Sequence, residues 1–193
     1  MIDCYIDMDG VLAQYDKSAY TGPNPRWLDP DAHYFAHVKP DDKMVDVVVK
    51  LTNMLANRSK NDIHITSCHF LSSLAKQGSI MTVQYKDKCE WLDNCVGIHM
   101  STLLIPSLTG KRHTVESRYD GKLSAKDVLI DDFNPNLIEW QKAGGTAIKY
   151  LNGQNDKDSF DGIVIDESMT SDDIINMLRL IDKALQHQYM GRK

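Results

Sequence analysis

The chain has 193 residues, of which 42% are hydrophobic and 25% are charged, a composition typical of a globular protein with one core domain. The formal net charge is −5 and no block of basic residues forms a stripe, which argues against a nucleic-acid polymer as partner. The four cysteines form no C-x-x-C pair, and no apolar run approaches membrane-spanning length. We therefore expect a cytoplasmic protein with reduced thiols and no membrane contact.

The first third of the chain predicts two strands separated by an insertion and a helix. Residues 2–6 (IDCYI) form a short apolar strand that ends at Asp7. The segment 14–40 is rich in proline, aromatic and turn residues, so we expect an irregular, partly helical insertion there. Apolar residues at helical spacing predict a helix over 42–57, and a polar turn separates this helix from a second strand, IHIT, at 63–66.

The rest of the chain continues this alternation. A predicted helix over 82–95 leads into an apolar stretch at 98–105 that we expect to be a strand, and 111–118 predicts a short helix. The segment DVLIDD at 127–132 is an apolar strand that closes on two acids. The remaining elements are a helix at 135–143, strands at 146–150 and 163–165, and a helix at 171–186 with Ser171 as its N-cap.

This alternation predicts an α/β fold, a three-layer Rossmann-like parallel sheet flanked by helices. Residues 1–193 should form a single core domain, with residues 14–43 as a small helical cap inserted after the first strand. In such sheets, ligands bind beyond the carboxyl ends of the strands. Three predicted strands finish in acids or hydroxyls, which should meet in one crevice. These residues are Asp7 and Asp9, Thr66 and Ser67, and Asp131 and Asp132.

The D-x-D-G stretch at 7–10 permits three interpretations. An EF-hand calcium loop is excluded because the glycine comes too early and a strand precedes the loop. A solvated turn accounts for residues 7–10 by themselves, but it does not explain why two other predicted strands also end in polar residues, at 66–67 and 131–132. Phosphoryl transfer accounts for all of them, with Asp7 as the nucleophile. Asp9, on the same side of the strand, would protonate the departing alkoxide and then activate the water.

A carboxylate that attacks a phosphate needs cations to offset the repulsion between the two anions. Oxygen ligands in an acidic cluster suit Mg²⁺, which also binds substrate phosphate and water. A lysine should neutralise the remaining charge, while Thr66 and nearby N–H groups hold the phosphate oxygens. The metal ligands available are the Asp7 carboxylate, the backbone carbonyl of Asp9, and the Asp131 or Asp132 carboxylate.

These residues resemble the haloacid dehalogenase superfamily of aspartate-nucleophile phosphatases. The four motifs of that family are matched, in order, by DMDGV (7–11), the hydroxyl in ITS (65–67), a lysine, and LIDD (129–132). The sequence DMDGVLA followed by an aromatic residue, and the run over 128–153, further resemble the 5′(3′)-deoxyribonucleotidases and their bacterial and phage relatives. The similarity touches most of the core. It implies an Mg²⁺-dependent phosphatase that works through an aspartyl-phosphate.

The resemblance also implies a role for each matching residue. The carried-over roles are nucleophile for Asp7, acid/base for Asp9, phosphate binding for Thr66 and Ser67, and metal binding for Asp132 with Asp131 beside it. The insertion is shorter than in the animal enzymes, and their other base-contacting aromatic residues have no counterpart that we can match here. Substrate choice is therefore less well specified than the chemistry.

Two further positions carry a role. Tyr15 falls where the resembled family has an aromatic residue that stacks on the base. For the motif-three lysine, Lys111 fits best because it opens a predicted helix after an apolar strand. Lys122 and Lys126 lie closer to LIDD in the sequence, and Lys88 lies farther away; they stay alternatives.

The sequence thus predicts a phosphomonoesterase whose substrate is a nucleoside monophosphate, with deoxyribonucleotides included. A phosphatase for another small ester, such as a sugar phosphate, is the alternative within the same chemistry. A non-catalytic binding module of the same fold is a further alternative, although such modules usually lose one of the two motif-one aspartates and this chain keeps both.

Overall fold

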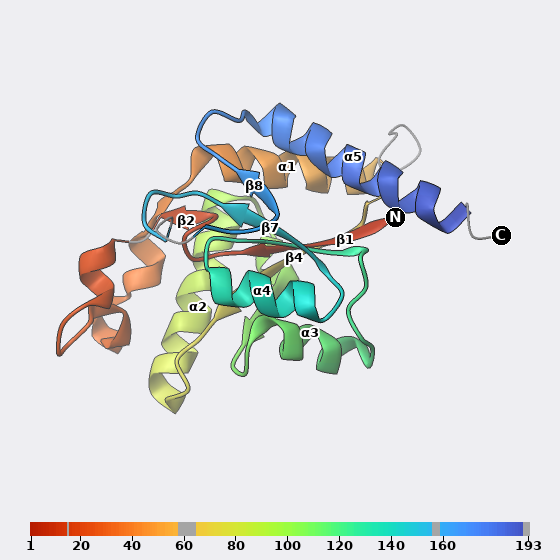
Figure 1. Ribbon diagram of the computed structural model, residues 1–193. Coiled ribbons are helices and arrows are strands. Elements are labelled where there is room, and N and C mark those ends of the chain that lie inside the picture. The colour runs from red at the N-terminus through yellow and green to blue at the C-terminus, as the bar shows by residue number, and fades with distance from the viewer. Residues whose placement is uncertain (15, 58–64, 156–158, 191–193) are drawn as a thin grey trace.

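The computed structural model describes residues 1–14, 16–57, 65–155 and 159–190, and it confirms the predicted α/β architecture (Figure 1). A six-stranded parallel sheet has the order β5-β4-β1-β6-β7-β8. Its strands are β1 (Ile2–Asp7), β4 (Ile65–Ser73), β5 (Leu104–Ser107), β6 (Asp127–Asp131), β7 (Thr146–Tyr150) and β8 (Ile163–Ile165). Because the strands are parallel, all their carboxyl ends lie along one edge of the sheet.

Helices cover both faces of this sheet, as alternating strand side chains require. On one face, α1 (Asp42–Ala56), α2 (Gly78–Cys95) and α5 (Ser171–Met190) bury a core that includes Cys4 and Ile6. On the other face, α3 (Lys111–Tyr119) and α4 (Asn134–Lys142) pack over Tyr5. None of the described helices is long and apolar enough to cross a membrane.

Two predicted strands have different bounds in the structure. The second strand, β4, starts within the predicted range and continues to Ser73, because Phe70 and Leu71 are buried in the sheet and pair with Ile6 and Asp7. The predicted strand at 98–105 is wrong in its first half, which is the 3-10 helix η6 (Met100–Leu103). The chain turns there at His99, whose φ is +69°, and only the residues after η6 join the sheet. Residues 58–64, with the predicted polar turn, lie outside the described residues.

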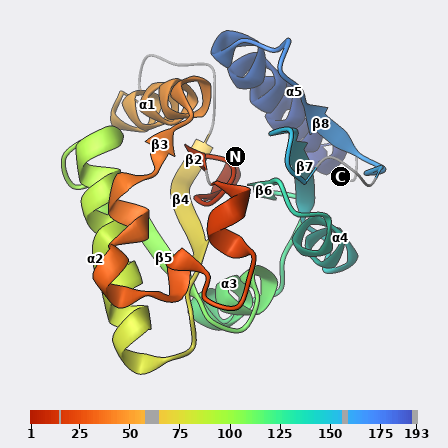
Figure 2. The same cartoon turned by 90° about the vertical axis from the view of Figure 1, so that its left-hand side faces the viewer.

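The segment predicted to be irregular contains four short 3-10 helices between two short antiparallel strands, β2 (Ala13–Gln14) and β3 (Lys39–Pro40). We call residues 16–38 the cover segment. It contains η1 (Lys17–Tyr20), η2 (Arg26–Leu28), η3 (Pro30–Ala32) and η4 (Tyr34–His37). Figure 1 shows the cover segment beyond the carboxyl ends of the strands, whereas the N-terminus and the end of α5 lie at the opposite side. Figure 2 shows the cover segment running alongside α2.

One face of α2 holds the cover segment through polar contacts. The Gln84 side-chain amide donates to the Trp27 carbonyl at 2.7 Å. The buried Asp87 carboxylate lies 2.9 Å from Nδ1 of His33. The indole N–H of Trp91 donates to the Val38 carbonyl at 2.6 Å. These α2 residues are three and four positions apart, so they share one helix face.

The junction between the cover segment and α1 offers a test of the fold. Asp41 caps α1 by accepting from the Met44 N–H at 3.0 Å, and its other oxygen accepts from the Tyr150 hydroxyl at 2.6 Å. Asp41→Ala removes both bonds, so we expect a loss of about 1–2 kcal/mol in the free energy of unfolding. Urea denaturation measures it. Asp42→Ala, one residue into the helix, is the matched control and should cost clearly less; equal losses would contradict the capping role.

Candidate active site

Three carboxylates gather at the carboxyl edge of the sheet. Asp7 ends β1, Asp131 ends the neighbouring strand β6, and Asp132 follows it. All three are buried, and one carboxylate oxygen from each lies within 4.8 Å of the others. The sequence prediction that Asp7, Asp131 and Asp132 meet at one strand edge is thus confirmed in position.

A tight turn after β1 brings Asp9 back over this edge. Gly10 has φ +86°, a backbone conformation that residues other than glycine rarely adopt, so a residue with a Cβ would be strained there. The Gly10 N–H donates to the Ala13 carbonyl at 2.8 Å, and its own carbonyl accepts from the Asn152 side chain at 2.8 Å. The chain therefore leaves the strand end at once and keeps the Asp9 side chain beside that of Asp7.

Lys111 neutralises part of the carboxylate cluster. Its Nζ lies 2.6 Å from Asp7 Oδ1 and 2.6 Å from Asp131 Oδ2. Burial opposes its charge, but the two carboxylates more than compensate and raise the pKa of Lys111 above its ordinary value. Lys111 is the first residue of α3, which follows β5 directly across the same edge. The structure thus brings the predicted motif-three lysine into the cluster.

The cluster holds more negative charge than one lysine can balance. Burial raises the pKa of Asp7 well above its ordinary value; Lys111 opposes this shift, and Asp131, Asp132 and Asp9 add to it. Burial and the Asp131 carboxylate likewise raise the pKa of Asp132 to about 6, against the effect of its amide donors and Lys111. Each carboxylate would therefore gain from a further cation.

Asp132 is held by the loop that follows β7. The side-chain amides of Asn152 and Asn155 both donate to Asp132 Oδ2 at 2.7 Å. The buried Lys149 Nζ donates to the Asp132 carbonyl and to Asn134 Oδ1. The two amides hold the carboxylate by Oδ2. No hydrogen bond from the described residues reaches Oδ1, so Oδ1 is available to a ligand.

This donor set fits a hard divalent cation. Carboxylate oxygens are the ligands that Mg²⁺ prefers, and three of them converge here without a sulfur or imidazole ligand. Both oxygens of Asp131 already accept hydrogen bonds. Lys111 and the Asn136 amide donate to its Oδ2, and the Phe133 N–H donates to its Oδ1. Asp7 and Asp132 are therefore the better direct ligands.

Asp9 has a different set of partners. Its Oδ2 accepts from Lys88 Nζ at 2.6 Å and from the Ser72 hydroxyl at 3.1 Å. Lys88 comes from the middle of α2 and is fully buried. Nothing in the sequence pattern favoured Lys88, yet the structure places it on Asp9, as it places Lys111 on Asp7.

The predicted location of Thr66 and Ser67 is wrong. They lie at the beginning of β4, where Ser67 pairs with Asp3 at the start of β1 and donates to its side chain at 2.6 Å. The strand ends instead at Ser72 and Ser73. The predicted strand ends too early because IHIT covers only the beginning of β4, which stays in the sheet for nine residues.

Ser72 and Ser73 are site residues that the sequence interpretation missed. Ser72 contacts Asp9, and Ser73 lines the cavity at the carboxyl edge. A signal was present, since a second hydroxyl pair follows the apolar residues of CHFL. The alternative lysines Lys122 and Lys126 belong to the other end of the sheet, near Asp3. Tyr15 lies outside the described residues.

A cavity of about 510 Å³ opens above the carboxylates. Lys111 is the one lysine or arginine among the described residues that line it. Most of its wall is apolar or aromatic, and the aromatic side chains are Trp27 and Phe35 of the cover segment and Phe133 after β6. The cavity therefore has charged residues at the sheet edge and apolar side chains on the side of the cover segment.

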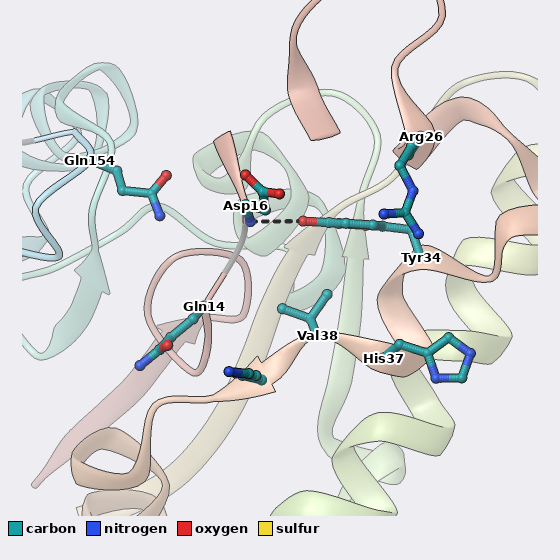
Figure 3. Close-up of a pocket in the computed structure, with 8 residues that line it drawn as sticks. Gln14, Asp16, Arg26, Tyr34, His37, Val38 and Gln154 are labelled. Atoms are coloured by element: carbon teal, nitrogen blue, oxygen red, sulfur yellow. Dashed lines mark hydrogen bonds between the residues drawn. The ribbon is translucent and has the colours of Figure 1, made fainter. Parts of the chain in front are cut away.

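A second cavity, of about 350 Å³, lies beside the cover segment (Figure 3). In it the Tyr34 hydroxyl points toward Asp16 and accepts from the Asp16 N–H at 3.0 Å. Gln14 and Asp16, the sequence neighbours of Tyr15, both line this cavity, as does Arg26.

Comparison with solved structures identifies the fold. A D,D-heptose 1,7-bisphosphate phosphatase from B. bronchiseptica, complexed with magnesium and phosphate, matches with a TM-score of 0.54 at 13% identity, covering 97% of this chain and 99% of that one. This chain has a haloacid dehalogenase-like fold. No family model and no curated protein matches the sequence.

Two further solved structures support this assignment of the fold. The D,D-heptose 1,7-bisphosphate phosphatase from Burkholderia thailandensis has a TM-score of 0.56 at 9% identity, covering 92% of this chain and 99% of that one. A haloacid dehalogenase-like hydrolase from Streptococcus pneumoniae has a TM-score of 0.54 at 8% identity, with coverages of 92% and 98%.

The raised pKa of Asp132 predicts how Mg²⁺ affects stability. Folded Asp132 holds its proton up to about pH 6, so the stability that this proton supplies is lost as the pH rises through that value. Mg²⁺ needs the deprotonated carboxylate, so it should raise the melting temperature by several degrees at about pH 8 and by much less at about pH 5. Differential scanning calorimetry measures both shifts.

Asp132→Asn removes a buried negative charge and a proposed metal ligand. The metal-free variant should therefore be at least as stable as the wild type at about pH 8, while most of the Mg²⁺-induced shift disappears. Asp161→Asn, at an exposed position, is the matched control and should keep the full shift. The same Mg²⁺ shift in Asp132→Asn as in the wild type would contradict the assignment of this carboxylate.

Proposed function

We propose that this chain is an Mg²⁺-dependent phosphomonoesterase that works through an aspartyl-phosphate on Asp7. One observation carries the proposal: a buried carboxylate with a lysine and two further carboxylates lies at the strand edge, with a second aspartate beside it. A nucleophile, a charge-balancing lysine, a cation site and an acid/base group are the parts that this chemistry needs. The haloacid dehalogenase-like fold supports it.

In this proposal each residue has one task. Asp7 attacks the phosphorus with the carboxylate oxygen that does not bind Lys111, and the ester oxygen leaves with a proton from Asp9. Asp9 then removes a proton from the water that hydrolyses the phosphoenzyme. Lys111 offsets charge on the phosphate. Mg²⁺ on Asp7 and Asp132, with Asp131 and the Asp9 carbonyl nearby, would supply the remaining positive charge.

Ser73 takes the phosphate-binding role that the sequence interpretation gave to Thr66 and Ser67. Ser73 is exposed and lines the same cavity as Asp9, whereas Thr66 and Ser67 lie at the beginning of β4, at the other end of the sheet. A hydroxyl at this place can donate to a non-bridging phosphate oxygen. Ser72 stays with Asp9 and Lys88, inside the protein.

For the substrate we propose a nucleoside monophosphate, with the cover segment acting as the cap. The aromatic side chains of the cavity wall suit a flat, apolar leaving group such as a base. The two heptose bisphosphate phosphatases favour a sugar phosphate as the alternative. A bisphosphate is less suitable here, because the described lining offers Lys111 as its single lysine or arginine. The four cysteines are free, in keeping with the cytoplasmic location that we propose.

Phosphate release tests the chemistry and the substrate together. We expect Mg²⁺-dependent release from a subset of ribo- and deoxyribonucleoside 5′-monophosphates, and none with chelator. Asp7→Asn should lower kcat at least about a thousandfold while the protein stays folded. A panel of sugar monophosphates and bisphosphates is run in parallel. Activity confined to sugar phosphates would replace the nucleotide, whereas silence on every ester, aryl phosphates included, would favour a binding module.

Tyr15 stays a prediction from the sequence, and it can be tested directly. If its ring stacks on the base, Tyr15→Ala should raise KM for a nucleotide about tenfold, because base–aromatic stacking is worth about 1–3 kcal/mol. Release from an aryl phosphate should change much less. Tyr119→Ala, at an exposed tyrosine that shares a pocket with Asp3 at the start of β1, is the control. Equal losses on both substrates would remove Tyr15 from the base site.

A further inference from the structure

Lys88 is a buried lysine whose ammonium group is fully engaged. Its Nζ lies 2.6 Å from Asp9 Oδ2, 2.7 Å from the Ser72 hydroxyl and 3.0 Å from the Ser73 carbonyl. A lysine ammonium has three N–H donors, and three acceptors surround this one. Lys88 therefore has no donor left for a substrate phosphate, in contrast with Lys111, which lines the cavity.

A charge at this place needs an explanation beyond packing. Burying an ion pair costs desolvation, and an apolar side chain of similar volume is often at least as stabilising. Lys88 has no exposed surface, so it also contributes nothing to solubility. What it does is connect three parts of the site: α2, the end of β4 and the Asp9 carboxylate.

The contacts fix which way Asp9 faces. Both the Lys88 and Ser72 bonds fall on Oδ2. Because these two donors hold one oxygen against α2 and β4, the rotation of the carboxylate is restricted. The other oxygen, Oδ1, is then the one that can carry a proton to a leaving group, and Asp9 itself lines the cavity.

We propose that Lys88 is a positioning residue for Asp9, holding Oδ2 so that Oδ1 delivers the proton to the leaving-group oxygen. This inference rests on the proposed phosphatase function and adds to it a residue outside the four motifs. Lys88 acts through Asp9 and does not touch the substrate. Its absence should therefore matter most where the leaving group depends most on that proton.

The cover segment completes the environment of Lys88. The centroid of the buried Phe35 ring lies 4.0 Å from Lys88 Nζ, which is the geometry of a cation–π contact. Phe35 comes from η4, the part of the cover segment that packs on α2. The ring helps to bury the Lys88 ammonium group, whereas the Asp9 side chain keeps 19% of its surface exposed and lines the cavity.

The test compares two substrates that differ in leaving group. We measure kcat/KM with Mg²⁺ for a simple alkyl phosphate, whose alkoxide needs a proton, and for 2,4-dinitrophenyl phosphate, whose phenolate leaves without one. In Lys88→Met, the loss on the alkyl phosphate should exceed the loss on the aryl phosphate by at least about tenfold, since a positioned general acid supplies 10²–10⁴. Lys86→Met, on the exposed side of α2, is the matched control and should leave both values unchanged.

Three other outcomes would count against the proposal. Equal losses on both substrates in Lys88→Met would show a merely structural role and overturn this proposal alone. A wild type silent on both substrates would overturn the proposed function and this proposal with it. If Lys88→Met does not fold, Lys88→Met/Asp9→Asn removes both charges together; it should lose no more alkyl phosphate activity than Asp9→Asn, and a further loss would overturn the proposal.

Discussion

Repulsion among buried carboxylates at one sheet edge shapes the site, and the surrounding contacts offset it. Two unit charges about 4 Å apart repel by roughly 4 kcal/mol at an effective dielectric near 20, so a cluster of acids cannot stay ionised there without partners. Lys111 bridges Asp7 and Asp131, and asparagine amides hold Asp132. Burial and the neighbouring carboxylates still raise the pKa of both Asp7 and Asp132. A divalent cation would supply the positive charge that is still missing, and the negative charge of a phosphate-bearing substrate would increase the need for it.

Helix α2 links this edge to the cover segment. Along one helix face, Gln84, Asp87 and Trp91 hold the cover segment, and Lys88 holds Asp9. These polar side chains are buried because each has a partner, and none would be expected from an ordinary amphipathic helix. The same helix, α2, therefore positions both the cover segment above the cavity and the proposed acid/base Asp9. A shift of α2 would change both the room above Asp7 and the orientation of Asp9.

The sequence was sufficient for the carboxylate cluster, because strand ends in a parallel sheet share one edge and Asp7, Asp131 and Asp132 follow apolar strands. Lys111 could be chosen since it begins a helix directly after a strand. The hydroxyls proposed to bind phosphate were misplaced because the length of a buried strand cannot be inferred where histidine and serine interrupt the apolar residues of β4. Lys88 could not be assigned, since its contact with Asp9 depends on how α2 is rotated against the sheet. Tyr15 stays a prediction.

The most direct test of the account is to trap the phosphoenzyme. The protein is mixed with Mg²⁺ and the preferred ester, quenched in acid within one turnover, digested, and its peptides are weighed by mass spectrometry. The account predicts one phosphate on the peptide that contains Asp7, and none in Asp7→Asn. Rapid phosphate release with no phosphorylated peptide, or with the phosphate on another residue, would contradict it, because Asp7 would then not be the nucleophile.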